Sequence, residues 1–454
     1  MKTLSYLLLI LGLVSTLAAA PDRSLLLISI DGLRPDSISE ADGYGLKIPH
    51  LRQLWKTSAH ASGVRGVLPS STYPSHTSIV TGNWPAVHGV AANRPFKPND
   101  KAINRWYWYN DEMKVPAIWD AATAAGYEVG SVSWPVTVGA PGIKYNIPEF
   151  AGTKSEEDVK IIRGFAGGAF MDGLARKAGV YLNDAKDGVG RDWSRTRYLL
   201  ELLRQHRPRV ALVHLVALDH EQHAHRPFSP QAKAALEEID TMVGEIVKAM
   251  RGNYPDSAVC VVSDHGFTSV DHALAIDAAF VRAGLITLKG GGTSIESAGL
   301  KDWVAMPWLS SGSVAIVMKN PKDEAAKRKV KEVLDRLASD PANGIHAVLD
   351  REAIARLGGT GQAEFWLDLK TDFTSSSRIV GASLIELKTG GTHGHVPTHA
   401  AMNSTFLLSA PGVRASDVGI IDMRSIAPTL AAWLRAPFPS APLPPLDVFS
   451  ASAK

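Results

Sequence analysis

The chain has 454 residues, of which 45% are hydrophobic and 20% are charged, and its formal net charge is +3. This length allows one large domain or two to three smaller ones, and the composition lacks the long polar tracts that disorder requires. Because the small net charge is spread over interspersed acidic and basic residues, we expect no stable complex with nucleic acid.

The first twenty residues have the pattern of a secretory signal peptide. Lys2 precedes an apolar run, 7–13, and small residues follow at 18–20. The run is too short to span a bilayer comfortably, so we expect an exported mature chain, periplasmic or secreted, without a transmembrane segment. Cys260 is the only cysteine, which excludes an intrachain disulfide and favours a bacterial periplasm over an animal cell surface.

Short apolar runs have the pattern of strands that are buried on both faces. They lie at 24–30, 210–218 and 258–262. Apolar residues recur at helical spacing at 116–125, 196–205 and 231–250. Strands that alternate with helices predict a mostly parallel α/β sheet with helices on both faces, which binds ligands at the carboxyl ends of its strands.

The segment 272–389 differs from this pattern and is interpreted as an inserted α+β subdomain. Its predicted elements are strands at 313–318 and 364–369 and a helix at 323–338. The catalytic core is then predicted to comprise 21–271 and 390–454, and it closes with a helix at 426–434.

Acidic and histidine side chains follow the predicted strands or lie in a Gly/His-rich loop: Asp31, Asp219, His223, Asp264, His265 and His393. Each residue alone could belong to a turn, a surface ion pair or a loop. Together they supply the oxygen and imidazole ligands that suit Zn²⁺, and they can fill two neighbouring sites. Two metals about 3.5–4 Å apart can clamp the attacking and leaving oxygens of a displacement at phosphorus. The sequence therefore predicts two Zn²⁺ per chain, with a different assignment, such as one Mn²⁺ or Ca²⁺, as an open alternative.

Thr72 is the predicted nucleophile of this metal site. It lies just before a helical run at 76–81, where free backbone N–H groups and the positive end of the helix dipole favour phosphate oxygens. Coordination of its hydroxyl by a metal would lower the hydroxyl pKa and favour the alkoxide. The alternative role for Thr72 is an ordinary helix N-cap.

The order of these motifs resembles the alkaline phosphatase superfamily and, within it, the nucleotide pyrophosphatase/phosphodiesterase family. The resemblance runs from about Ser24 to Ala410. The motifs are Asp31-Gly32, Thr72-Tyr73-Pro74-x-His76, Val80-Thr81-Gly82, His88-Gly89-Val90 with Asn93, Asp219-x-x-x-His223, Ser263-Asp264-His265-Gly266 and Gly391-x-His393-Gly394.

The resemblance implies an alkaline-phosphatase-like fold, a zinc-dependent hydrolase and an assignment of ligands. One zinc would be held by Asp219, His223 and His393. The other would be held by Asp31, Asp264, His265 and the Thr72 oxygen. Asn93 would hydrogen-bond a non-bridging phosphate oxygen. Three further histidines near the predicted site are interpreted as lying outside the ligand set: His220, His225 and His399.

Other segments favour a small phosphodiester or nucleotide as the substrate. Residues 116–119 and 132–135 resemble family segments that precede the nucleotide pocket, and 131–137 lacks the Lys-x-Arg pair expected of threonine phosphomonoesterases. The pocket wall is predicted to contain Tyr73, Trp134 and Tyr145. A phosphomonoesterase or phosphonate hydrolase with the same metals and nucleophile is the second hypothesis, and a metal-binding receptor without turnover is the third. The sequence indicates no oligomeric state.

Overall fold

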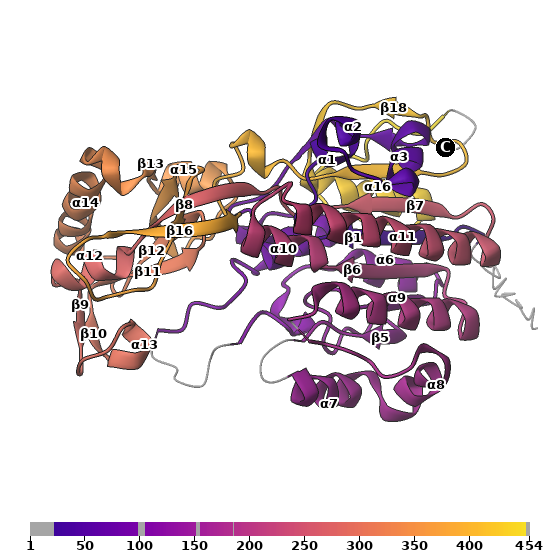
Figure 1. The fold of residues 1–454 in the computed structure, drawn as a ribbon, viewed down its shortest axis with the longest axis horizontal. Coiled ribbons are helices and arrows are strands. Elements are labelled where there is room, and N and C mark those ends of the chain that lie inside the picture. The colour runs from indigo at the N-terminus through magenta and orange to yellow at the C-terminus, as the bar shows by residue number, and fades with distance from the viewer. Residues whose placement is uncertain (1–21, 99–104, 151–154, 185, 451–454) are drawn as a thin grey trace, which may run out of the picture.

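The computed structural model describes residues 22–98, 105–150, 155–184 and 186–450 (Figure 1). The predicted signal peptide, residues 1–20, lies outside the described residues. Within the described part of the chain, every helix is too short or too polar to span a lipid bilayer.

An eight-stranded, mostly parallel sheet forms the centre of the molecule (Figure 1). Its strands, in spatial order, are β18 (Ser416–Asp417), β2 (Ala59–His60), β17 (Phe406–Ser409), β7 (Ala258–Val262), β1 (Leu25–Ile30), β6 (Val210–Leu215), β4 (Val129–Val132) and β5 (Tyr145–Ile147). Strand β1 is parallel to β6 on one side and to β7 on the other, whereas β17 is antiparallel to β7. The predicted mostly parallel sheet is confirmed.

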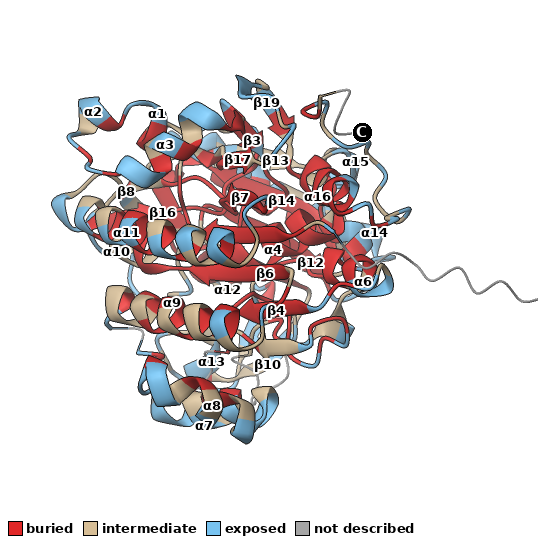
Figure 2. Cartoon of the chain, turned by 90° about the vertical axis from the view of Figure 1, so that its right-hand side faces the viewer, coloured by how far each residue is buried: buried red, intermediate tan, exposed pale blue. Residues whose placement is uncertain are grey.

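Helices cover both faces of this sheet. Successive side chains of a strand point to opposite faces, and in β1 both sets of side chains are apolar. Leu26 and Ile28 of β1 belong to a core shared with α3 (Pro49–Thr57), α9 (Gly188–Gln205) and α11 (Pro230–Asn253). Leu25 and Leu27 belong to a second core shared with α4 (Thr72–Thr81), α6 (Ile118–Ala124) and α16 (Ile426–Leu434). Figure 2 shows the strands buried between the helical layers. The continuous apolar sequence of β1 thus reflects burial on both faces.

Shorter elements surround the central layers. The helices are α1 (Asp36–Ser39), α2 (Ala41–Tyr44), α5 (Pro85–His88), α7 (Ser155–Ala166), α8 (Gly168–Ala178) and α10 (Ala217–His225). Short 3₁₀ turns lie at Asn110–Glu112, Pro341–Asn343, Ala400–Met402 and Met423–Ser425. A separate two-stranded sheet pairs β3 (Gly63–Arg65) with β19 (Ile420–Asp422).

The segment between β7 and β17 contains further sheets, which lie at one end of the molecule (Figure 1). An antiparallel sheet has the order β11 (Ala305–Ser310), β12 (Ser313–Met318), β14 (Ala363–Leu369), β13 (Ile345–Leu349). The others pair β15 (Phe373–Ser375), β8 (Thr268–Leu274) and β16 (Ile385–Thr392), and β10 (Leu300–Trp303) with β9 (Ile286–Leu288). The helices are α12 (Ile276–Arg282), α13 (Ile295–Ala298), α14 (Glu324–Ser339) and α15 (Arg351–Arg356).

This segment has a hydrophobic core of its own, which includes Phe280, Ile316 and Leu334. The predicted subdomain boundaries, at 272 and 389, fall inside β8 and β16, which pair with each other. The assignment of an inserted subdomain stays a prediction.

One predicted strand is shorter than expected. The apolar run 210–218 forms a strand only to Leu215, and α10 begins at Ala217. Ala217 and Leu218 are buried in the first turn of that helix, so the apolar run continues through the boundary. Apolar runs of this kind do not distinguish a buried strand from a buried helix.

Candidate active site

The carboxyl ends of three neighbouring strands bring most of the candidate metal ligands together. Asp31 directly follows β1, and Asp264 and His265 follow β7. Strand β6 leads into α10, which carries Asp219 and His223 one helical turn apart. Because β7, β1 and β6 are adjacent and parallel, these side chains meet at one edge of the sheet.

Asp31, Asp264 and His265 form a buried group with converging ligand atoms. His265 Nε2 lies 3.3 Å from Asp31 Oδ1 and 3.2 Å from Asp264 Oδ2. The second oxygen of each carboxylate has a partner: Asp31 Oδ2 lies 3.1 Å from His214 Nε2, and Asp264 Oδ1 accepts a hydrogen bond from Gly32 N–H. Among the described residues, nothing hydrogen-bonds the three converging atoms. Such orphaned buried atoms fit a bound cation.

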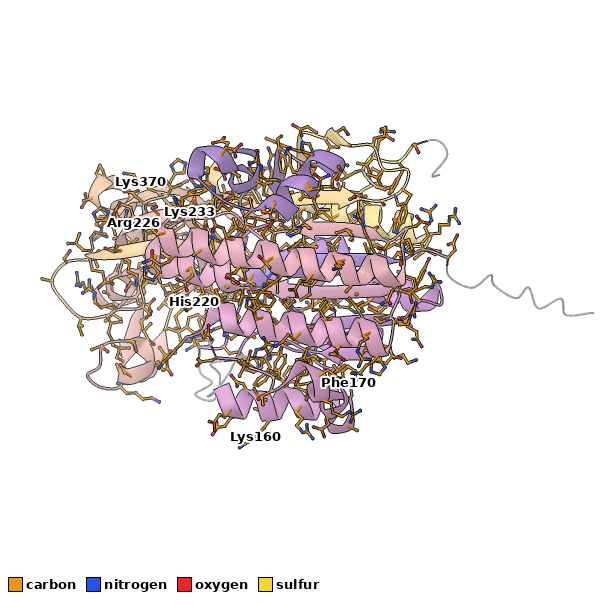
Figure 3. The ribbon with its side chains drawn as sticks, turned by 45° about the vertical axis from the view of Figure 1, so that its right-hand side comes forward. Lys160, Phe170, His220, Arg226, Lys233 and Lys370 are labelled. Carbon is orange, nitrogen blue, oxygen red and sulfur yellow. The ribbon has the colours of Figure 1, made fainter. Side chains whose placement is uncertain are left out.

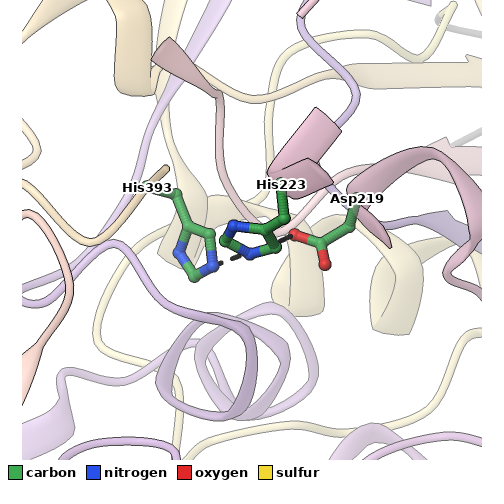
Figure 4. A group of neighbouring side chains, drawn as sticks. All are labelled: Asp219, His223 and His393. Atoms are coloured by element: carbon green, nitrogen blue, oxygen red, sulfur yellow. Dashed lines mark ion pairs between the residues drawn. The ribbon is translucent and has the colours of Figure 1, made fainter. Parts of the chain in front are cut away.

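Asp219, His223 and His393 form the second group, in which the three side chains point toward one another (Figure 4). Asp219 Oδ1 lies 3.4 Å from His223 Nε2 and 3.8 Å from His393 Nε2. His393 reaches this position because β16 passes close to α10. A Cβ atom on Gly390, whose φ is 143°, would lie 2.2 Å from the His223 carbonyl oxygen, so only glycine permits this approach.

The three histidines share one arrangement that leaves Nε2 available. In each ring, Nδ1 lies 3.0 Å from a backbone carbonyl oxygen, which is that of Gly391 for His223, Gly266 for His265 and Ser70 for His393. A carbonyl oxygen can only accept, so Nδ1 carries the proton and Nε2 keeps its lone pair. Metal-ligating histidines are oriented in this way by hydrogen bonds to their other nitrogen.

The electrostatics of the two groups also fit divalent cations. Burial, and then the charges of Asp264 and Asp219, raise the pKa of Asp31 well above its usual value. Burial lowers the pKa of His265 to about 4 and that of His393 well below its usual value, so both rings are neutral, as metal ligands must be. The His265 and His393 rings stack at 3.6 Å, which places the two groups side by side. A divalent cation in each group would remove the repulsion among the carboxylates.

Thr72 is the first residue of α4 and lines a cavity of about 780 Å³. The same cavity is lined by the whole second group, Asp219, His223 and His393. Among the described residues, none accepts a hydrogen bond from the Thr72 amide. Thr72 and the amide at the start of α4 therefore lie beside the second group of candidate metal ligands.

Asn93 also lines the cavity, and its side chain is fixed by the start of α4. Its Oδ1 accepts a hydrogen bond of 2.9 Å from Tyr73 N–H. Among the described residues, none accepts a hydrogen bond from Nδ2, so this group can donate to a ligand near Thr72.

The aromatic side chains predicted to form the pocket wall do not line this cavity. Neighbouring residues of a helix point about 100° apart, so the side chain of Tyr73 faces away from that of Thr72. Tyr73 is buried, and its hydroxyl donates a hydrogen bond to Glu149. Trp134 is fully buried in the core. Tyr145, at the start of β5, stacks on His206 at 4.4 Å. Among the described residues, Phe96, Trp106 and Trp308 are the Phe, Tyr or Trp side chains that line the cavity.

Sequence reasoning missed a buried network behind the ligands. His214 bridges Asp31 and Glu149, with a distance of 2.8 Å from its Nδ1 to Glu149 Oε2. Burial would raise the pKa of Glu149, but His214 and Arg195 lower it to about 2. Glu149 also accepts the hydroxyl of Tyr73, so the network joins Asp31 to the first turn of α4. One signal was available, since His214 is a polar residue within an apolar strand, whereas no pattern marks Glu149.

A comparison with protein families matches residues 25–394 to the model described as type I phosphodiesterase/nucleotide pyrophosphatase. An uncharacterized pyrophosphatase/phosphodiesterase of Schizosaccharomyces pombe is 26% identical over 263 residues, which are 57% of this chain and 48% of that protein. Human ectonucleotide pyrophosphatase/phosphodiesterase family member 1 is 26% identical over 247 residues, 53% of this chain and 23% of that protein. The chain therefore spans about half or less of the length of these curated relatives.

Solved structures share the fold. An inactive variant of murine ectonucleotide pyrophosphatase/phosphodiesterase 5, in complex with AMP, superposes with a TM-score of 0.64 at 19% identity. The match covers 94% of this chain and all of that one.

Proposed function

The chain belongs to the type I phosphodiesterase/nucleotide pyrophosphatase family and has its alkaline-phosphatase-like fold, and from this premise we propose that it hydrolyses phosphodiester or pyrophosphate bonds. Nucleotide-type substrates are favoured. The observation that supports this most strongly is the pair of adjacent ligand groups, joined by the stacked rings of His265 and His393, of which the Asp219 group lines the cavity that contains Thr72. A hydroxyl at a helix N-terminus next to two cation sites suits displacement at phosphorus.

The residues present fit two Zn²⁺ ions. Asp219, His223 and His393 would hold one ion, and Asp31, Asp264 and His265 would hold the other together with the Thr72 oxygen. When bound, the ions would lower the pKa of the Thr72 hydroxyl and stabilise negative charge on the leaving oxygen.

Thr72 would act as the nucleophile in a two-step reaction. Its Oγ forms a bond to phosphorus as the bond to the leaving oxygen breaks, and the proton from Thr72 ends on the leaving group. A water molecule then forms a new bond to phosphorus as the Thr72–phosphorus bond breaks, and one of its protons restores the hydroxyl. In both steps Asn93 Nδ2–H and the Thr72 amide would donate to the non-bridging oxygens, which carry the developing charge.

The cavity suits a substrate with a second group on phosphorus. A phosphomonoester is a dianion whose extra oxygen needs additional donors or a cation, whereas Asn93 supplies one neutral amide. A diester is a monoanion that needs space and an apolar wall, which Trp106 and Phe96 provide. Lys97 and Lys388 also line the cavity and suit the further phosphate of a pyrophosphate substrate.

Export of the chain is part of this proposal. Residues 1–20 would be removed as a signal peptide, and a small phosphodiester or nucleotide outside the cytoplasm would be the substrate. The N-terminal sequence of the protein purified from its native host tests this point.

Initial rates on three aryl esters test the activity: a nitrophenyl phosphate monoester, a nitrophenyl nucleotide diester and a nitrophenyl phosphocholine. We expect kcat/KM for the nucleotide diester to exceed that for the monoester by at least roughly 100-fold, about 2.7 kcal/mol of transition-state stabilisation. The Thr72→Ala variant, purified in parallel, measures any contaminating activity. If the monoester is the better substrate, the diesterase assignment is wrong. If the phosphocholine ester is the best substrate, nucleotides are not the favoured substrates.

A further inference from the structure

A third group of metal-ligand side chains lies outside the candidate active site. His346 belongs to β13, Asp368 to β14, and His399 to the loop that follows His393. One ligand atom from each of the three lies within 4.8 Å of the others. None of the three lines the cavity that contains Thr72.

A β-bulge accounts for the position of His346. Ile345 pairs with Leu369 and Ala347 pairs with Asp368, so His346 is an extra residue between the two pairs. Bulges leave one residue unpaired and redirect its side chain, and they recur at functional sites. Here the bulge lies directly beside Asp368, and the rings of His346 and His399 are 5.2 Å apart.

Asp368 presents a single oxygen to the histidines. Its Oδ1 accepts a hydrogen bond of 3.2 Å from Val396 N–H, while its Oδ2 lies 2.7 Å from His399 Nε2. The carboxylate is buried, with 3% of its residue surface exposed, and buried charges are paired or coordinate metals. This arrangement repeats that of Asp264, in which a backbone N–H holds one oxygen and the other faces a histidine.

We propose that His346, Asp368 and His399 form a third divalent-cation site, with Zn²⁺ as the favoured ion and water as the remaining ligand. Two imidazole nitrogens and one carboxylate oxygen are a donor set that suits Zn²⁺. Ligands about 2.0–2.1 Å from one tetrahedral ion lie roughly 3.3–3.5 Å apart. His399 and Asp368 would therefore separate by less than about 1 Å, and the exposed side chain of His346 would rotate inward.

The site would fasten the loop that carries a ligand of the active site. Gly312 N–H donates to the His393 carbonyl oxygen at 2.9 Å, and Ser313 Oγ donates to that of Gly394 at 2.6 Å, so the antiparallel sheet already contacts the start of this loop. At the end of the same loop His399 already contacts Asp368 of β14, and an ion would strengthen this contact and extend it to His346 of β13. Figure 3 shows Lys370, two residues after Asp368, on the side of the molecule formed by this sheet. An ion that binds only the folded state stabilises that state.

Zinc stoichiometry of the full-length protein tests the proposal. Wild type, His346→Ala and Asp368→Asn are stripped with chelator, dialysed against the same buffered Zn²⁺ solution and measured by elemental analysis. His272→Ala is the matched control, because His272 is a partly exposed histidine on β8 that stacks on Phe373 and belongs to none of the ligand groups among the described residues. We expect both test variants to bind one Zn²⁺ fewer per chain than wild type and the control.

The readout is a difference between variants, so it does not depend on the proposed active-site metals. Failure of the two-zinc proposal would lower the zinc content of every protein equally and leave the difference of one. Equal zinc content in wild type and His346→Ala would overturn the third site, as would an equal loss in His346→Ala and His272→Ala. His346 is exposed, so its replacement by Ala decides the matter even if Asp368→Asn does not fold. The Zn²⁺-dependent rise in Tm should also be smaller for His346→Ala than for the control.

Discussion

In the proposed site Asn93 would have two separable roles, and two substitutions distinguish them. Its Oδ1 accepts the Tyr73 amide at the start of α4, and its Nδ2 group is left to donate to the substrate phosphate. Asn93→Asp keeps an acceptor for Tyr73 N–H but replaces the donor by a negative charge. Asn93→Ala removes both the acceptor and the donor.

We expect Asn93→Asp to lose more activity than Asn93→Ala, and Asn93→Ala to lose more stability than Asn93→Asp. Loss of one donor to an oxyanion typically costs about 2.7–4 kcal/mol, a 10²–10³-fold loss of kcat, which we expect for Asn93→Ala. In Asn93→Asp a carboxylate about 4 Å from a phosphate charge adds roughly 4 kcal/mol of repulsion at an effective dielectric constant of about 20, a further 10²–10³-fold loss. The net free energy of unfolding should instead fall only in Asn93→Ala, by about 0.5–1.5 kcal/mol, because the Tyr73 amide loses its acceptor.

The assay combines kcat/KM for the aryl nucleotide diester, zinc content and Tm for the zinc-loaded proteins. Activity should decrease in the order wild type, Asn93→Ala, Asn93→Asp, whereas Asn93→Asp should be the more stable of the two variants. An Asp variant within tenfold of the wild-type rate, or faster than the Ala variant, would refute the donor role of Asn93.

The other predictions concern the nucleophile, the metals and one buried acid. Thr72→Ala should abolish turnover with zinc content close to two at the active site, and Thr72→Ser should keep part of the activity; a wild-type-like rate for Thr72→Ala would remove the covalent mechanism. Chelation should inactivate the enzyme and lower its Tm, because the bound ions stabilise only the folded state and neutralise Asp31 and its neighbouring carboxylates; unchanged activity after metal loss shown by elemental analysis would contradict this. Burial raises the pKa of Asp277 to about 7, against about 3.9 when unfolded, so folding stability should fall as pH rises from about 4 to 7. The free energy of unfolding of Asp277→Asn should therefore exceed that of wild type by up to about 4 kcal/mol at pH ~8 and by little at pH ~4, measured by denaturant unfolding. An equal difference at both pH values would show that Asp277 does not titrate in this range.

The local sequence pattern was sufficient to predict the bounds of elements that are continuously apolar and bounded by polar residues. The strand β7 and the helix α16 have the bounds that the pattern predicted, because both elements are apolar and buried along nearly their whole length. The order of motifs was likewise sufficient to identify the family. The pattern could not show where β6 ends, since apolar residues continue from the strand into α10.

The direction in which a side chain points was decided only by the tertiary structure. Tyr73 is adjacent to Thr72 in sequence, yet the helix turns it into the core, while Trp106, more than thirty residues away, faces the cavity. The pairing of His214 with Glu149 joins residues 65 positions apart.

The grouping of His346, Asp368 and His399 likewise depends on strand pairing, on a bulge and on the path of a loop, none of which is encoded in neighbouring residues. Contacts of this kind arise when separate elements bury their apolar surfaces against one another, because the free energy of burial depends on area and not on sequence separation. The residue types available for the site are therefore determined by the sequence, and which of them meet is determined by packing.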